Sequence, residues 1–162
     1  MLRKIPRILN PDFMKILLEM GHGDEIVFGD ANFPADSMGQ RVVHLEGNRV
    51  TEILEALMPF FPLDNYAGEN AILMSVVPGH GREPEVWNKY RETIHKYDEE
   101  AYFQEFSFLT REEFYERSKT AYAVVATGER EKYANLILKL GVVEGEKKCY
   151  DKTGNRSSAA GI

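Results

Sequence analysis

The sequence predicts a single α/β domain, in which helices flank a mostly parallel sheet. The chain has 162 residues, which suits one globular domain with a substantial core. Short apolar runs alternate with segments of helical periodicity, as in folds whose helices pack on a parallel sheet. Several of these runs are apolar throughout, which is typical of strands buried on both faces. We expect the domain to span residues 1–143, followed by a polar tail over residues 144–162.

The chain is expected to begin with a helix over residues 11–20 and a strand over residues 25–29. Asn10 followed by Pro11 is a helix-start signature, because asparagine caps the first turn and proline lacks an N–H that would be unpaired there. The run Ile26–Phe28 is apolar throughout and bounded by acidic residues and glycine. It is short enough for a buried strand.

The strand-then-helix pattern recurs in the middle of the chain. A weak strand at residues 42–43 precedes a helix over residues 50–58, which Pro59 ends. A third buried strand is expected within residues 71–77, and residues 84–97 have apolar side chains at helical spacing. The order of elements therefore continues to favour a parallel sheet.

The last elements complete the expected sheet. Residues 102–109 form an aromatic-rich segment that could be a strand. Thr110 and Glu113 have the spacing of a capping box that opens a helix. Residues 121–127 are the most convincing strand, and the apolar run 135–140 closes the domain.

Composition excludes several classes of function. The formal net charge is −6, whereas a nucleic-acid-binding surface needs clustered cations. There is neither an apolar run of about 18 residues nor a secretory signal, so we expect a cytoplasmic protein. Cys149 is the single cysteine and no zinc-site spacing is present. Without a P-loop or a dinucleotide fingerprint, we expect no metal and no cofactor.

One short stretch concentrates the polar chemistry. His22 stands between Gly21 and Gly23, just before the strand at residues 25–29, and Asp30 follows that strand directly. The glycines leave the imidazole on a bare turn, although Gly21 could equally be a helix stop. In parallel sheets, ligands bind beyond the strand ends. A histidine with nearby carboxylates suits proton transfer to and from a small polyol.

Several motifs together resemble the L-fucose mutarotases of the RbsD/FucU sugar mutarotase family, which includes the ribose pyranase and ribose-transport accessory proteins. The matching segments are Met20–Ile26, Asp30–Pro34, Phe114–Arg117, Ala126–Arg130 and Tyr133–Leu138. They occur in order and extend over nearly the whole domain. The resemblance implies an RbsD-like α/β fold and interconversion of sugar anomers without cofactor. It also implies a homo-oligomeric ring, commonly a decamer of stacked pentamers.

The resemblance also implies roles for individual residues. His22 would be the proton donor, and a second group of residues would bind the sugar: Asp30, Arg111, Tyr133, Ala134 and Asn135. Most fucose mutarotases have glycine where this chain has Ala134. The ribose branch has a histidine where this chain has Arg111, so arginine points to fucose. The alternatives are a D-ribose mutarotase and a non-catalytic sugar-binding protein.

Each role has a structural alternative. Asp30 could be a strand-end cap, Arg111 a surface charge and Tyr133 a packed aromatic residue. Phe33 is interpreted as structural, although aromatic rings often stack on sugars, and Tyr115 is assigned to packing. His80 matches no motif.

One geometric argument is independent of the resemblance. A strand rises about 3.3 Å per residue, so His22 and Asp30 at the two ends of one strand would be on the order of 20 Å apart. Both cannot contact one monosaccharide unless the turn folds back along the strand. We therefore expect a neighbouring subunit to supply at least one site residue.

Overall fold

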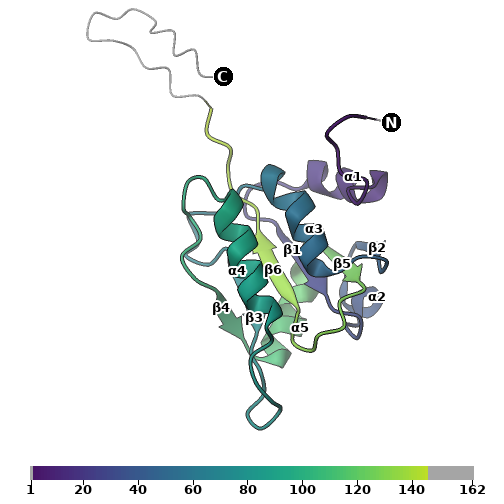
Figure 1. Ribbon diagram of the computed structural model, residues 1–162, viewed down its shortest axis with the longest axis vertical. Coiled ribbons are helices and arrows are strands. Elements are labelled where there is room, and N and C mark those ends of the chain that lie inside the picture. Colours follow the sequence, from purple (N-terminus) through teal and green to yellow (C-terminus); the bar gives the residue numbers. More distant parts are fainter. Residues whose placement is uncertain (1, 146–162) are drawn as a thin grey trace, which may run out of the picture.

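The computed structural model describes residues 2–145, so the expected tail lies almost entirely outside the described residues. Within this part of the chain, helices cover both faces of a six-stranded sheet (Figure 1). The strands are β1 (Glu25–Gly29), β2 (Val42–Leu45), β3 (Ala71–Met74), β4 (Ser107–Leu109), β5 (Ala123–Thr127) and β6 (Leu136–Lys139). The α-helices are α1 (Pro11–Glu19), α2 (Ala35–Met38), α3 (Val50–Leu57), α4 (Val86–Tyr97) and α5 (Arg111–Thr120). A short 3₁₀ helix, η1 (Met58–Phe60), extends α3. The predicted fold class is confirmed.

Both helix-start signatures are present. The Asn10 side chain accepts a hydrogen bond from the Phe13 N–H at 2.9 Å. In the capping box, the Glu113 carboxylate accepts a hydrogen bond from the Thr110 N–H at 2.8 Å. The Thr110 hydroxyl accepts in return from the Glu113 N–H at 3.3 Å. Such caps satisfy N–H groups that a helix leaves unpaired at its start.

The structure differs from the expected elements in two places. The aromatic segment 102–109 contains only the short strand β4, because Phe103 and Phe106 fill the core from irregular backbone. The Asp98 carboxylate and the Asn70 amide hydrogen-bond to the backbone of this segment. The loop after β1, for which no helix was expected, contains the short helix α2.

The sheet has the order β2-β5-β1-β6-β3-β4. β6 is antiparallel to both of its neighbours, β1 and β3, whereas the other neighbouring strands in residues 2–145 are parallel. The carboxyl ends of β1, β3 and β4 therefore lie at the same edge of the sheet as the start of β6. We call this the cavity edge. The opposite edge, where β1 starts and β6 ends, we call the histidine edge.

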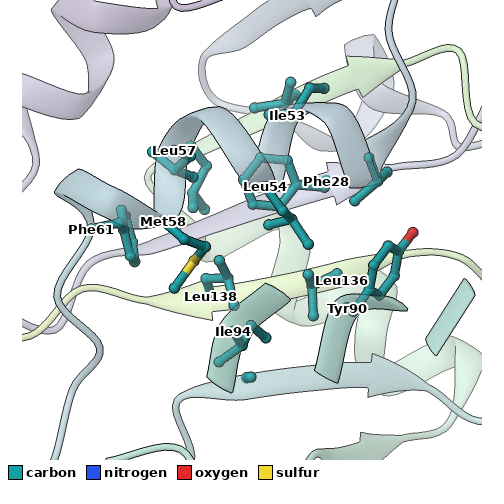
Figure 2. Close-up of a cluster of buried hydrophobic side chains, with 14 of the residues drawn as sticks. Phe28, Ile53, Leu54, Leu57, Met58, Phe61, Tyr90, Ile94, Leu136 and Leu138 are labelled. Carbon is teal, nitrogen blue, oxygen red and sulfur yellow. The ribbon is translucent and has the colours of Figure 1, made fainter. Parts of the chain in front are cut away.

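Two layers of apolar side chains hold the helices on the sheet. Helices α1, α3 and α4 cover one face, and α2 and α5 cover the other. Figure 2 shows the first layer, where Leu54 of α3 and Ile94 of α4 pack with Phe28, Leu136 and Leu138 of the sheet. All five are fully buried, and burying such a side chain stabilises the fold by about 1.5–3 kcal/mol. This core makes the strand ends a rigid base for functional side chains.

An ion-pair cluster fastens α5 to the histidine edge. The Arg117 guanidinium contacts Glu25 at 2.6 Å and Glu69 at 2.8 Å, and Lys139 contacts Glu25 at 3.2 Å. Burial by itself would raise the pKa of Glu25, but the hydrogen bonds and charges of Arg117 and Lys139 outweigh it and lower that pKa. Glu25 therefore stays ionised within the cluster.

Candidate functional site

A cavity of about 350 Å³ opens at the cavity edge. Each group that lines it comes from a strand end or the segment next to one. Asp30 follows β1, Met74 ends β3, Arg111 follows β4, and Tyr133 and Asn135 lead into β6. The lining residues are Asp30, Asn32, Phe33, Met74, Arg111, Tyr115, Lys132, Tyr133 and Asn135. The strand directions thus bring together four of the sugar-binding residues expected from the sequence: Asp30, Arg111, Tyr133 and Asn135.

Asp30 is held rigidly in the wall of this cavity. The residue is 7% exposed, and its Oδ1 accepts a hydrogen bond from the Asn32 N–H at 2.9 Å. The Asp30 N–H donates to Asn135 Oδ1 at 2.7 Å, which ties the end of β1 to the start of β6. Burial, with the nearby charge of Glu129, raises the pKa of Asp30 despite these hydrogen bonds. A desolvated carboxylate of this kind gains strongly from a hydroxyl donor.

Helix α4 fixes the backbone that precedes β6. Trp87 Nε1 donates to the Tyr133 carbonyl at 2.8 Å, and the Tyr90 hydroxyl donates to the Ala134 carbonyl at 2.9 Å. Tyr133 has φ +60°, a left-handed conformation that is uncommon for residues other than glycine. Ala134 is fully buried and is absent from the cavity lining. Its expected contact with the sugar stays a prediction, and its carbonyl serves to anchor the segment.

Aromatic side chains complete the cavity. The Arg111 guanidinium carbon lies 5.3 Å from the centre of the Tyr115 ring, and a hydrogen bond with Tyr115 raises the pKa of Arg111. Tyr115 also packs edge-on against Phe33, with ring centres 5.6 Å apart. The sequence alone favours packing roles for both aromatic residues, although Arg111 and Tyr115 have the i, i+4 spacing of neighbours on a helix face. That spacing was the available signal that Tyr115 shares the site of Arg111.

His22 is not part of this cavity. The Gly23 N–H donates to the Leu140 carbonyl at 2.8 Å, which places the turn at the histidine edge. There His22 Nε2 lies 2.9 Å from Asp64 Oδ1, and the imidazole packs edge-on against Tyr66 with ring centres 5.1 Å apart. The side chain is 48% exposed. The turn does not fold back along β1, so one subunit does not gather His22 and Asp30 around a single sugar.

Asp64 is a functional candidate that the sequence did not reveal. Its side chain is 2% exposed and also accepts a hydrogen bond from the Ala67 N–H at 2.9 Å. Burial would raise the pKa of Asp64, but hydrogen bonds from Ala67, His22 and Tyr66 together lower it. An ionised carboxylate that hydrogen-bonds to an imidazole fixes the orientation of the ring. The pair forms because Leu63, next to Asp64, bridges to Leu140.

The chemistry of the cavity suits a small ligand rich in hydroxyl groups. A carboxylate, two amides, a guanidinium, an ammonium and two phenols surround it, and the Phe33 ring offers an apolar surface. Residues 2–145 contain no cluster of histidine, cysteine and acidic side chains that could hold a metal ion. None of the helices in this part of the chain has both the length and the apolar character that crossing a membrane requires.

Comparisons with known proteins show which family the chain resembles. The model of the RbsD / FucU transport protein family matches residues 3–143. The fucose mutarotase of Streptococcus pneumoniae, solved in complex with L-fucose, is 44% identical, with a TM-score of 0.80 over 88% of this chain and 100% of that one. FucU of Bifidobacterium longum is 45% identical, with a TM-score of 0.81 over 86% of this chain and 99% of that one.

A solved protein of the ribose branch is less similar. RbsD of Bacillus subtilis, solved in complex with D-ribose, is 28% identical, with a TM-score of 0.63 over 84% of this chain and 95% of that one. The family model matches most of the chain, and two solved relatives share more than 40% of their residues with it over nearly their whole length. This chain therefore belongs to the RbsD/FucU family.

Proposed function

We propose that this protein is an L-fucose mutarotase, which interconverts the α and β anomers of free L-fucose. The observation that carries the proposal is the cavity that groups Asp30, Arg111, Tyr133 and Asn135. It occurs in a chain 44% identical to a fucose mutarotase that was solved with L-fucose. D-Ribose is the second candidate, with less support, because the RbsD solved with D-ribose is only 28% identical.

The reaction needs proton transfer and no other chemistry. Ring opening requires a proton delivered to the ring oxygen while the anomeric hydroxyl loses one, which breaks the bond between the ring oxygen and the anomeric carbon. The aldehyde then rotates about the bond between C1 and C2, and reclosure reverses both transfers. An imidazole can donate and recover a proton near neutral pH. His22 supplies this group, and Asp64 holds its ring in place through the 2.9 Å contact between Oδ1 and Nε2.

The cavity residues bind and orient the sugar. The Asp30 carboxylate accepts hydrogen bonds from sugar hydroxyls, while Asn135 and Tyr133 donate or accept according to the hydroxyl that they face. Arg111 is the cationic contact expected from the resemblance, and Lys132 is a second cation in the cavity lining. Tyr115 lies beside Arg111 and, like Tyr133, offers a phenol in the cavity for a second proton transfer at the anomeric hydroxyl. The ring of Phe33 packs on the apolar face of the sugar.

A complete site then requires two subunits. The histidine edge of one subunit would meet the cavity edge of its neighbour, which brings His22 to the ring oxygen of a sugar bound at Asp30. Such a contact uses two different surfaces and closes into a ring when the rotation allows it. A homodecamer of stacked pentamers in the cytoplasm is our proposal for the assembly.

Saturation transfer in proton NMR between the anomeric signals tests the function directly. We expect the wild-type protein to accelerate exchange of L-fucose anomers far above buffer, and to accelerate D-ribose exchange less. His22→Ala should lower the protein-catalysed rate by about 10²–10⁴-fold, the usual contribution of a general acid. The matched control is His44→Ala, an exposed histidine of β2, which should leave the rate unchanged.

Three outcomes separate the alternatives. Faster exchange of D-ribose than of L-fucose would favour the ribose mutarotase. Binding of L-fucose without exchange above buffer would favour a non-catalytic sugar-binding protein. Exchange by His22→Ala at the wild-type rate would remove His22 from the mechanism.

A further inference from the structure

The loop between β3 and α4 carries a histidine that reaches the cavity. His80 Nδ1 lies 3.0 Å from the Tyr133 hydroxyl. His80 is exposed to solvent, whereas Tyr133 is half-buried and lines the cavity. The two residues are 53 positions apart in the sequence. The contact therefore joins a surface loop to a sugar-binding side chain.

The backbone of this loop turns so that the imidazole meets the Tyr133 hydroxyl. The His80 N–H donates to the Val77 carbonyl at 3.0 Å and closes a tight turn. Gly79 and Gly81 on either side have φ of +87° and +119°, a region that side-chain-bearing residues rarely adopt. The two glycines thus allow the chain to reverse at His80, in front of the first turn of α4.

Tyr133 is consequently held at both ends. Its carbonyl accepts from Trp87 Nε1 at 2.8 Å, and Trp87 is buried in the first turn of α4. Its hydroxyl is engaged by His80, on the loop that leads into the same helix. A phenol fixed only through its backbone can still rotate about its side-chain bonds. The second contact restricts that rotation and fixes where the hydroxyl lies in the cavity.

We propose that His80 is a positioning residue, which holds the Tyr133 hydroxyl in the orientation that binds the sugar. The inference deepens the proposed function and rests on it. When Nδ1 accepts the phenolic hydrogen, the Tyr133 oxygen presents its lone pairs to a sugar hydroxyl. When Nδ1 carries a hydrogen, it donates to that oxygen, and Tyr133 donates its own hydrogen to the sugar. His80 thereby sets whether the Tyr133 hydroxyl accepts a hydrogen bond from the sugar or donates one to it.

A role in positioning predicts a change in substrate affinity more than in turnover. A net hydrogen bond changes an equilibrium by about two- to tenfold, so His80→Ala should raise the KM for L-fucose by about that factor. The maximal exchange rate should stay within about twofold, because His80 contacts no reacting atom. His80→Asn places an amide close to the position of Nδ1 and should restore KM to within about twofold of wild type.

A double-mutant cycle with Tyr133→Phe tests whether His80 acts through Tyr133. In the Tyr133→Phe background, His80→Ala should have no further effect on KM. The matched control is Arg82→Ala, an exposed residue of the same loop, which should behave as wild type in both backgrounds. Equal effects of His80→Ala with and without the Tyr133 hydroxyl would overturn the proposal.

A measurement without substrate separates this inference from the proposed function. The chemical shift of the carbon that bears the Tyr133 hydroxyl, in protein with ¹³C-labelled tyrosine, should move in His80→Ala and not in Arg82→Ala. An unmoved signal would overturn the contact. An active wild type with unchanged KM in His80→Ala would overturn this assignment alone. A wild type that exchanges no anomers would overturn both this assignment and the proposed function.

Discussion

The two edges of the sheet carry the two halves of the expected chemistry, and they are built differently. The cavity edge collects buried or half-buried side chains from several strand ends, with Asp30 only 7% exposed. At the histidine edge, a 48% exposed imidazole stands on a turn against one buried carboxylate. The first edge has the shape of a binding site, and the second presents an imidazole outward.

This difference shows that residues at the two ends of one strand can lie too far apart to contact the same ligand. β1 separates His22 from Asp30 by on the order of 20 Å, because each residue of the strand advances about 3.3 Å. A monosaccharide spans much less. The predictions below test whether the two edges work together across a subunit boundary.

The largest effect is expected from mixing two inactive variants. His22→Ala removes the proton donor of the histidine edge and Asp30→Asn removes a charged hydrogen-bond acceptor of the cavity edge, so each alone should exchange anomers at no more than about 10% of the wild-type rate. The His22→Ala subunit keeps an intact cavity edge, and the Asp30→Asn subunit keeps an intact histidine edge. In a ring assembled at random from equal amounts of both, about a quarter of the interfaces therefore join two intact edges. Co-expression should therefore restore about a quarter of the wild-type rate. A mixture no more active than its separate components would show that each site is formed within one subunit.

The second prediction concerns the pair at the histidine edge. Asp64→Asn replaces a charge-assisted hydrogen bond worth about 1.5–3 kcal/mol, so the maximal exchange rate should fall about 10–100-fold. The control is Asp24→Asn, because Asp24 caps the same turn through the Gly21 N–H at 2.7 Å and is not the hydrogen-bond partner of the imidazole. It should stay within about threefold of wild type. Similar losses in both variants would assign Asp64 to the shape of the turn.

The smallest expected effect is on stability at the cavity edge. Burial raises the pKa of Asp30 in the folded protein above its ordinary value of 3.8. At any pH between 3.8 and the raised pKa, the folded state therefore holds more of this proton than the unfolded state, and stability falls as the pH rises. The wild type consequently loses stability across this interval, whereas Asp30→Asn does not. The stability of Asp30→Asn relative to the wild type should therefore increase as the pH rises from about 3.8 to 7. Urea denaturation at both pH values measures the difference, and a difference that stays constant or falls as the pH rises would contradict the raised pKa.

Most helices and strands could be predicted from the sequence, because caps and apolar runs involve residues that are close together in the chain. Asn10 before Pro11 and the pair Thr110 and Glu113 are caps whose partners lie within a few residues, and both are formed. The strand at residues 25–29 followed from one apolar run, and its length alone indicated that its two ends could not share a ligand. The binding roles of the residues at those ends stay predictions.

Contacts between distant segments could not be read from the sequence. Asp64 meets His22 only because the segment around Leu63 bridges to Leu140. Tyr115 and Phe33 were assigned to packing, since aromatic residues are usual in cores, and their place beside the cavity depends on how α5 lies against the sheet. The sequence also did not indicate that β6 is antiparallel to its neighbours, because an apolar run is compatible with either strand direction.

The position of β6 has a consequence for how the protein folds. The final strand of the described chain lies between β1 and β3, both of which precede it by more than 60 residues. Until residues 136–139 insert, the earlier strands have unpaired edges, and neither Tyr133 nor Asn135 is in place. Pairings over such sequence separations slow folding. During synthesis, the nascent chain therefore cannot form a sugar-binding cavity before almost the whole domain has left the ribosome.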